Sequence, residues 1–254
     1  RLVNRLTIHS AAPTLQTDSG SAPYVRTSVF GGGDISEHIW NFSGISSPIP
    51  ILEQNSYGSG VTVTTPAVNG TANFDGTVRS APLIISANGV VYPSVALEVL
   101  RAMFDQKNYQ TKVTDEVGIE WIRIGRQPPI ETTPTADIMI SYWNEFQRIS
   151  AVDLPKSDIQ GKILVWGLTA EGLNNPVSTP VGVMYPHEVQ ANILHSVSTG
   201  VLIQQSYYLE FVSLVLLLIV LLGILVVVYR LPTIYSGIVS LGIVGFQVLS
   251  LIHI

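Results

Sequence analysis

Two clusters of polar residues have the types and spacing needed to bind a ligand or act on one. In the first cluster, Asp75, Gly76 and Arg79 place a carboxylate four residues before a guanidinium group. Such a pair can hold a charged ligand. Asp-Gly between two extended runs is also a strong signal for a tight hairpin turn, because both residues tolerate positive φ. We therefore expect an ion pair between Asp75 and Arg79 that holds a hairpin, and a binding role stays the alternative.

The second cluster is a polar loop that contains Thr169, Glu171, Asn174 and Asn175. It follows "GKILVWG" (161–167), a short continuous apolar run of the kind found in strands covered on both faces. Ligands of α/β sheets bind beyond the carboxyl ends of the strands. The four polar residues are therefore candidate ligand-binding residues. An ordinary connecting loop is the alternative.

Templates for catalysis and for metal binding do not fit this sequence. The chain has no cysteine, which excludes zinc-thiolate sites and thiol catalysis. His187, Glu188 and His195 do not have the spacing of a zinc-protease helix, and Gly161-Lys162 lacks the first glycine of a phosphate-binding loop. No Gly-x-Ser-x-Gly motif is present. We therefore expect no catalytic residue, no metal and no cofactor in this chain.

Charge is scarce and unevenly distributed. Charged residues make up 12% of the sequence, against a typical value of about 25%. From Tyr207 to Ile254 the only formal charges are Glu210 and Arg230. The net charge is −5 and there is no basic run, which argues against nucleic acid as a partner. The sequence thus indicates two parts, a polar domain over 1–206 and an apolar region over 207–254.

The apolar region predicts a transmembrane helical hairpin. Phe211 to Tyr229 is an uncharged run of 19 residues, which at about 1.5 Å per residue can cross a hydrocarbon core of roughly 30 Å. A second uncharged run follows after Arg230, so we expect helices at about 208–229 and 233–254. Arg230 in the short connection favours a cytoplasmic loop, and this places residues 1–206 outside the cytoplasm. A buried core helix is the alternative.

The polar domain shows signals for both strands and helices. Asn88-Gly89 lies between two apolar runs and predicts a second hairpin. Ser94 then offers a helix start for residues 95–104, and a further helix over about 187–198 ends before Gly200. We expect further strands in "VTVTTPAV", "GIEWIRIG" and "ADIMISYW". Together these signals predict an α/β fold, a mixed sheet with β-hairpins and flanking helices.

The order of these motifs resembles one known family, the CHASE type 2 domain. The motifs are the Asp-Gly-x-x-Arg turn, a Ser-x-Ala-Leu helix start, "GKILVWGLTAEGL", "TPVG" and "HEVQANIL", followed at once by the apolar region. The residues that match the family's structural motifs are Asp75, Gly76, Arg79, Gly167, Glu188 and Asn192.

The resemblance implies an extracellular sensor of a bacterial receptor, truncated at its N-terminus. It implies sensory input to an output domain beyond Ile254, an adenylate or guanylate cyclase first and a histidine or Ser/Thr kinase second. It also implies a homodimer in the inner membrane, with a periplasmic sensor and an unidentified small-molecule or envelope signal. Two alternatives are a membrane-anchored extracytoplasmic enzyme that uses Asp75, His187 or Glu188, and an accessory subunit of a transport or secretion system.

Overall fold

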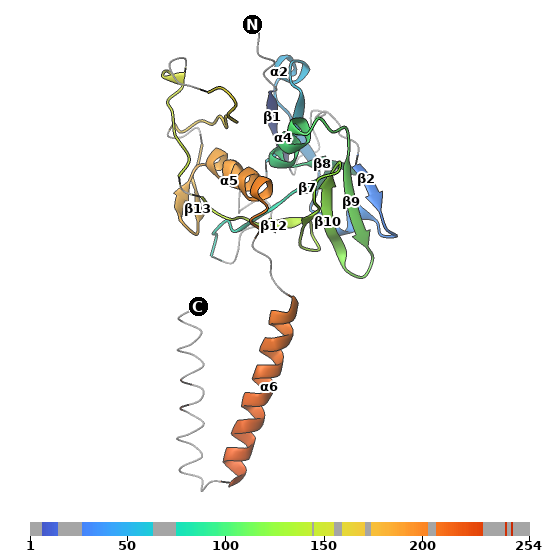
Figure 1. The fold of residues 1–254 in the computed structure, drawn as a ribbon, viewed down its shortest axis with the longest axis vertical. Helices are drawn as coiled ribbons and strands as arrows, with labels where there is room; N and C mark the ends of the chain where they lie inside the picture. The colour runs from blue at the N-terminus through green and yellow to red at the C-terminus, as the bar shows by residue number, and fades with distance from the viewer. Residues whose placement is uncertain are drawn as a thin grey trace. The chain divides into compact units, whose positions relative to one another are not determined.

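The computed structural model describes residues 7–14, 27–62, 75–143, 145–154, 159–170, 174–202 and 207–230, together with residues 242 and 245. The chain divides into two compact units, Arg1–Ile203 and Gln204–Ile254 (Figure 1). The first unit contains the strands and most of the helices. The second contains the long helix α6 (Tyr207–Arg230).

The largest sheet of the first unit has the strand order β11-β10-β9-β2. Its centre is the antiparallel pair β9 (Tyr109–Thr114) and β10 (Gly118–Ile124). β2 (Thr27–Phe30) lies parallel to β9, and β11 (Ile130–Glu131) lies antiparallel to β10. Alternate residues of β9 are buried, as expected for a strand with one face on the core.

The remaining strands form four small sheets. β1 (Ile8–Thr14) pairs with β4 (Gly44–Ser46) and β5 (Gly58–Val61), and β7 (Ile84–Ala87) lies between β3 (Asn41–Phe42) and β8 (Val90–Pro93). Two further pairs are β6 (Ser80–Pro82) with β12 (Asp137–Met139), and β13 (Val177–Thr179) with β14 (Gly182–Met184). The mixed α/β class is therefore confirmed, but the described strands are divided among small sheets instead of one mixed sheet.

Two helices cover the core of the first unit and lie side by side in Figure 1, α4 (Val95–Met103) and α5 (Pro186–Thr199). Leu97 and Leu100 of α4 pack in one apolar cluster with Val189 and Ile193 of α5. Among the described residues, two shorter helices are α1 (Ile35–His38) and α2 (Pro50–Gln54). The core thus fixes α5 against α4.

Several local predictions are confirmed. β7 and β8 form the predicted hairpin, and Asn88 and Gly89 have φ values of 50° and 74°, as its two-residue turn requires. Ser94 caps α4 by accepting the backbone N–H of Leu97 at 3.3 Å. α5 ends before Gly200, which has a φ of 69°.

The Asp-Gly turn is described only in part. Asp75 and Gly76 form a turn, and the strand predicted before them lies outside the described residues. After the turn, β6 begins at Ser80 and pairs with β12, which comes from a distant part of the sequence.

The prediction of a buried strand over residues 161–167 is wrong. This stretch has neither helix nor strand, and its side chains are mostly exposed, with Trp166 at 67%. The apolar residue pattern of this stretch is the pattern that buried strands have. A strand also needs a paired neighbour, however, and none of the described strands lies beside this stretch.

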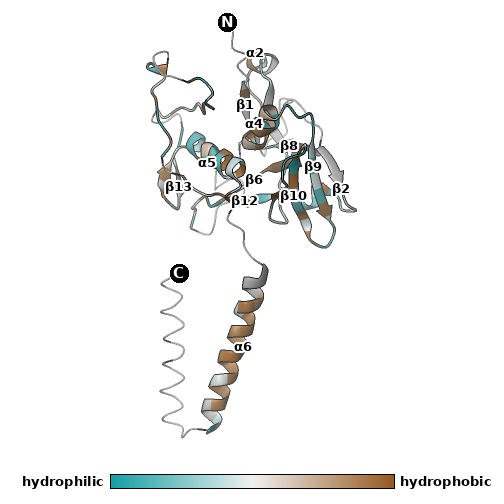
Figure 2. Cartoon of the chain, viewed as in Figure 1, coloured by the Kyte–Doolittle hydropathy of each residue, from teal (hydrophilic) through white to brown (hydrophobic). Residues whose placement is uncertain are grey.

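α6 is apolar along most of its length (Figure 2). The side chains of this helix are described for residues 211–226, 229 and 230. Over the described residues, the structure contains no helix that combines the length and the apolar character of a membrane span. The second expected helix, 233–254, lies outside the described residues except at 242 and 245, so the expected hairpin is not shown.

Candidate functional site

A stripe of polar side chains runs along one side of α5. Its members are Glu188, Asn192 and Ser196, four residues apart, so they lie one above another on the helix. Asn192 and Ser196 have no exposed surface. Buried polar groups of this kind are costly unless each finds a hydrogen-bond partner.

The partner of this stripe is the segment 141–148. Asn192 Oδ1 accepts the backbone N–H of Trp143 at 2.5 Å, and Ser196 Oγ accepts the backbone N–H of Ser141 at 2.9 Å. At the other end of the stripe, Arg148 Nε lies 2.7 Å from Glu188 Oε1. The helix and the segment are thereby joined at three levels.

Ring contacts add to this attachment. The ring of His195 lies 5.5 Å from that of Trp143 and 5.9 Å from that of Phe146, centroid to centroid. Separating the segment from α5 would leave buried polar groups without partners and would also break these contacts. We therefore expect α5 and the segment to move as one body.

The loop that contains Thr169 crosses the beginning of α5. Tyr185 precedes the helix, and its hydroxyl donates a hydrogen bond to the carbonyl oxygen of Thr169 at 3.1 Å. Gly167 lies directly against the ring of His187, so close that a Cβ at Gly167 would come within 2.1 Å of the ring. Glu188 caps the helix by accepting the backbone N–H of Tyr185 at 2.9 Å.

The four predicted ligand-binding residues differ in their contacts and exposure. The backbone of Thr169 contacts Tyr185, and the side-chain amide of Asn174 donates to the carbonyl oxygen of Leu168 at 3.2 Å. Asn175 is exposed, and Glu171 lies outside the described residues. The structure brings Thr169 and Asn174 to the same loop end, beside α5, and ligand binding by the four residues stays a prediction.

His187, at the beginning of α5, is a partly buried polar residue. Its Nδ1 atom is buried and has no hydrogen-bond partner among the described residues, and its ring stacks on Tyr185 at 5.9 Å. Burial lowers the pKa of His187, and this outweighs the opposing effect of the Glu188 charge. The imidazole is therefore kept in its neutral form more strongly than in water.

Asp75 and Arg79 form the expected ion pair. Arg79 Nη1 and Nη2 donate to the two carboxylate oxygens of Asp75 at 2.9 and 2.8 Å, and Asp75 also accepts the backbone N–H of Thr77 at 3.0 Å. The bonds from Arg79 and from Thr77 hold the pKa of the Asp75 carboxyl well below its usual range. Both groups are engaged in the turn, which disfavours a reactive pair.

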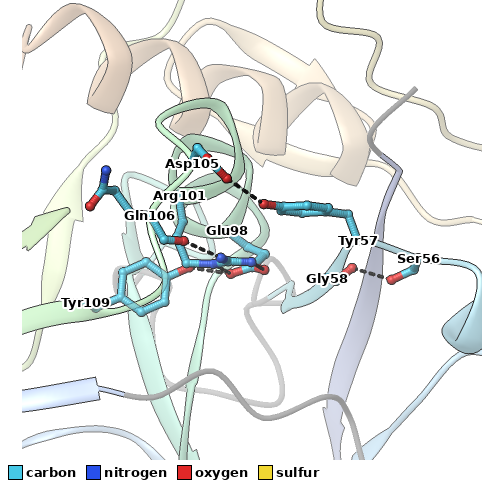
Figure 3. Close-up of polar contacts among 8 residues, drawn as sticks. All are labelled: Ser56, Tyr57, Gly58, Glu98, Arg101, Asp105, Gln106 and Tyr109. Carbon is cyan, nitrogen blue, oxygen red and sulfur yellow. Dashed lines mark hydrogen bonds and ion pairs between the residues drawn. The ribbon is translucent and has the colours of Figure 1, made fainter. Parts of the chain in front are cut away.

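A buried charged cluster on α4 is the site that sequence reasoning missed (Figure 3). Glu98 is completely buried, and its two carboxylate oxygens accept hydrogen bonds from Arg101 Nη2 at 2.5 Å and Nε at 2.9 Å. The hydroxyl of Tyr109, on β9, also donates to Glu98. Burial raises the pKa of Tyr109, and the Glu98 charge adds to the shift.

Neighbouring elements close around this cluster. Arg101 Nη1 donates to the carbonyl oxygen of Gln106 at 2.5 Å, and its guanidinium lies 5.5 Å from the ring centre of Tyr57. Gly58 on β5 packs so tightly that a Cβ there would come within 2.0 Å of Glu98 Oε1. The cluster therefore locks α4 to β9 and β5. We interpret this cluster as structural, because the charges of Glu98 and Arg101 are paired with each other.

A metal site is not indicated. Among the described residues, no group of three or more His, Asp or Glu side chains could hold an ion. Asp137 is a buried carboxylate, but its partners are the neutral donors Thr135 Oγ1 at 2.6 Å and Trp40 Nε1 at 3.3 Å. Burial raises the pKa of Asp137.

Comparison with protein families gives a match to this chain. The family model of the CHASE2 domain matches residues 22–229, which include the strands from β2 onward, α4, α5 and most of α6. No curated protein and no solved structure matches the chain.

Proposed function

The chain belongs to the CHASE2 domain family, a family of extracellular sensor domains in signalling receptors, and we propose that it is the sensory input and membrane region of a bacterial transmembrane receptor. In this proposal the polar domain receives an extracytoplasmic signal and passes it to a cytoplasmic output domain, an adenylate or guanylate cyclase. The chemistry of the output would belong to that domain. Four carboxylates of the sensor unit, those of Asp75, Glu98, Asp137 and Glu188, are engaged in structural bonds.

The observation that carries the proposal is the position of α5. It is the last helix of the sensor unit, and only residues 200–206 separate it from α6. Its polar stripe is attached to the segment 141–148, and its apolar face packs on α4. A signal that altered either attachment would therefore act on the helix that leads into the apolar region. Such a signal can work only through different affinities for two states of the domain.

The membrane location is supported by the sequence of the apolar region. The run from Phe211 to Tyr229 is uncharged, and Arg230 follows it directly. We propose helices at about 208–229 and 233–254 in the inner membrane, with residues 1–206 on the periplasmic side. Arg230 would then lie on the cytoplasmic side, as positively charged short loops do.

Single-cysteine labelling tests this topology cleanly, because the chain has no cysteine of its own. Ser178→Cys would place a thiol at an exposed position of β13, and Pro232→Cys would place one in the proposed cytoplasmic loop without removing Arg230. A membrane-impermeant maleimide should label Ser178→Cys in spheroplasts and Pro232→Cys only after permeabilisation. The reverse pattern, or extraction of the protein from membranes by alkaline carbonate, would disprove the proposed topology.

A further inference from the structure

One side of the His187 ring is covered by the loop 161–170. A Cβ at Gly167 would lie 2.1 Å from both Cγ and Nδ1 of the ring, so the backbone of Gly167 is already in van der Waals contact with the ring. Nδ1 is buried and has no hydrogen-bond partner among the described residues. The backbone of Gly167 also leaves no room on this side for a water molecule that could bond to Nδ1.

The protonation state of His187 decides how well this contact is tolerated. In a neutral imidazole the proton can sit on Nε2, and Nδ1 is then an acceptor without a donor. In the protonated ring Nδ1 also carries a hydrogen, which would be a charged donor buried without an acceptor, and such a group costs more to bury than a neutral one. Burial accordingly lowers the pKa of His187. The contact with Gly167 therefore fits the neutral ring and opposes the charged one.

The charged and titratable groups around His187 do not supply the missing acceptor. Glu188 favours the protonated ring and Arg148 opposes it. The Glu188 carboxylate is already engaged, since Arg148 Nε lies 2.7 Å from Oε1 and the backbone N–H of Tyr185 donates to Oε2 at 2.9 Å. The ring of Tyr185 stacks on His187 at 5.9 Å, and Lys162, the one charged residue of the loop, is a cation. A protonated His187 would therefore have to compete with Arg148 for Glu188, at a helix N-terminus that disfavours positive charge.

Besides this contact, one hydrogen bond among the described residues joins the loop to the beginning of α5. The hydroxyl of Tyr185 donates to the carbonyl oxygen of Thr169 at 3.1 Å. A single hydrogen bond contributes little net free energy, because water replaces either partner when the bond opens. Loss of the contact between His187 and Gly167 should therefore be enough to free the loop from the helix.

We propose that the contact between His187 and Gly167 is a pH-dependent latch. The latch holds the loop 161–170 on α5 while the imidazole is neutral, and protonation of the imidazole releases the loop. Because protons bind better to the open state, acidification shifts the equilibrium toward that state. Acidification outside the cytoplasm would then alter an attachment of the last sensor helix, and this role as a receptor input rests on the function proposed above.

The distance between the loop and α5 can be followed with two spin labels, because the chain has no native cysteine to compete for them. Leu168→Cys and Ser198→Cys place both labels at exposed positions. In the full-length protein in detergent, the distance between the labels should become longer and more broadly distributed from about pH 7.5 to about pH 5, the range in which histidine titrates. With His187→Asn, which keeps a neutral side chain against Gly167, the distribution should stay as it is at the higher pH. His9→Asn, in β1, is the matched control and should keep the natural response.

The reciprocal measurement is the pKa of His187 itself. Gly167→Ala should force the loop away from the ring at every pH, because its Cβ would overlap Nδ1, and Gly167 has no positive φ that alanine would strain. Since opening and protonation are linked, this change should raise the pKa of His187 toward its ordinary value of about 6.5. Nuclear magnetic resonance of isotopically labelled histidine measures the shift, with the His187 signal identified by its loss in His187→Asn. Gly32→Ala, whose Cβ meets nothing within 4 Å, should leave the pKa of His187 unchanged.

Three results would overturn the latch. They are a label distance that is the same at both pH values in the natural protein, an equal pH response in His187→Asn, and an unchanged pKa of His187 in Gly167→Ala. None of these measurements depends on the output domain or on the orientation in the membrane. Their failure would therefore leave the receptor proposal standing, whereas the reverse cysteine-labelling pattern would overturn that proposal and leave the latch in place.

Discussion

Asn192 on α5 accepts the backbone N–H of Trp143 at 2.5 Å, across 49 residues of sequence. Asn192 has no exposed surface, whereas Trp143 is 46% exposed. The bond lies in the middle of the stripe that joins α5 to the segment 141–148. It is therefore the contact whose loss should most directly loosen the last helix of the sensor.

Replacing Asn192 with alanine should leave the backbone N–H of Trp143 without its acceptor. We expect this change to lower the free energy of unfolding by about 0.5–1.5 kcal/mol, the usual net contribution of one hydrogen bond. Hydrogen exchange should accelerate at Trp143 before it does so in α4. Ser198→Ala is the matched control, because Ser198 is exposed on the same helix. An equal effect of the two variants would show that the bond to Trp143 contributes nothing.

Removing one member of the buried pair Glu98–Arg101 should destabilise the protein much more than removing both members. Arg101→Leu leaves the Glu98 carboxylate buried without its guanidinium, and we expect destabilisation of about 3–5 kcal/mol in thermal or denaturant unfolding. The double variant Glu98→Met with Arg101→Leu removes both charges and should recover most of that loss. A double variant as unstable as the single one would contradict the account of the cluster.

Substitution of Gly58 tests how tightly β5 packs against the same cluster. A Cβ at Gly58 would come within 2.0 Å of Glu98 Oε1, whereas a Cβ at Gly32 meets nothing within 4 Å. Gly58→Ala should therefore destabilise the protein by about 1–3 kcal/mol, as overpacking does. Gly32→Ala should change stability little, and unfolding of the two variants side by side checks the difference. A tolerated Gly58→Ala would mean that β5 does not press on Glu98.

His187 should make stability depend on pH. Burial lowers its pKa in the folded protein, so the folded state binds fewer protons than the unfolded state, in which histidine titrates near about 6.5. The contribution of His187 is complete above that value and declines as the pH falls through the lower folded pKa. Melting temperatures from pH 8 to pH 5 should therefore fall more steeply for the natural protein than for His187→Asn. Parallel curves would show that His187 titrates normally.

Local signals in the sequence were sufficient for several elements. Asn88-Gly89 acts through its own backbone conformation, and the side chain of Ser94 accepts a hydrogen bond from the first turn of α4. The β7–β8 hairpin and the start of α4 could therefore be predicted without distant parts of the chain. The helix predicted over about 187–198 is α5, and Val189, Ile193 and Val197, four residues apart, are buried on it. Of the polar stripe, Glu188 and Asn192 were identified by resemblance. Ser196 continues their four-residue spacing and could have been added from the sequence.

Other features depend on distant parts of the chain. Glu98 and Arg101, three residues apart on a helix, have the sequence signature of an ordinary solvated pair. Their burial results from Gly58 and Tyr109, which arrive from other strands, and no local pattern contains that information. The run 161–167 was mispredicted for the same reason, since an apolar pattern specifies a strand only when a neighbour pairs with it.

In the proposed receptor, the polar domain controls an output through α5. The most direct test is cyclic-nucleotide formation by membranes that contain the full-length protein, with the natural chain compared with the double variant Asn192→Ala, Ser196→Ala at equal protein level. We predict that loosening α5 from the segment 141–148 changes the basal rate of cAMP or cGMP formation several-fold, while Ser198→Ala leaves it unchanged. No cyclic nucleotide from the natural protein, or the same rate from all three proteins, would contradict the account.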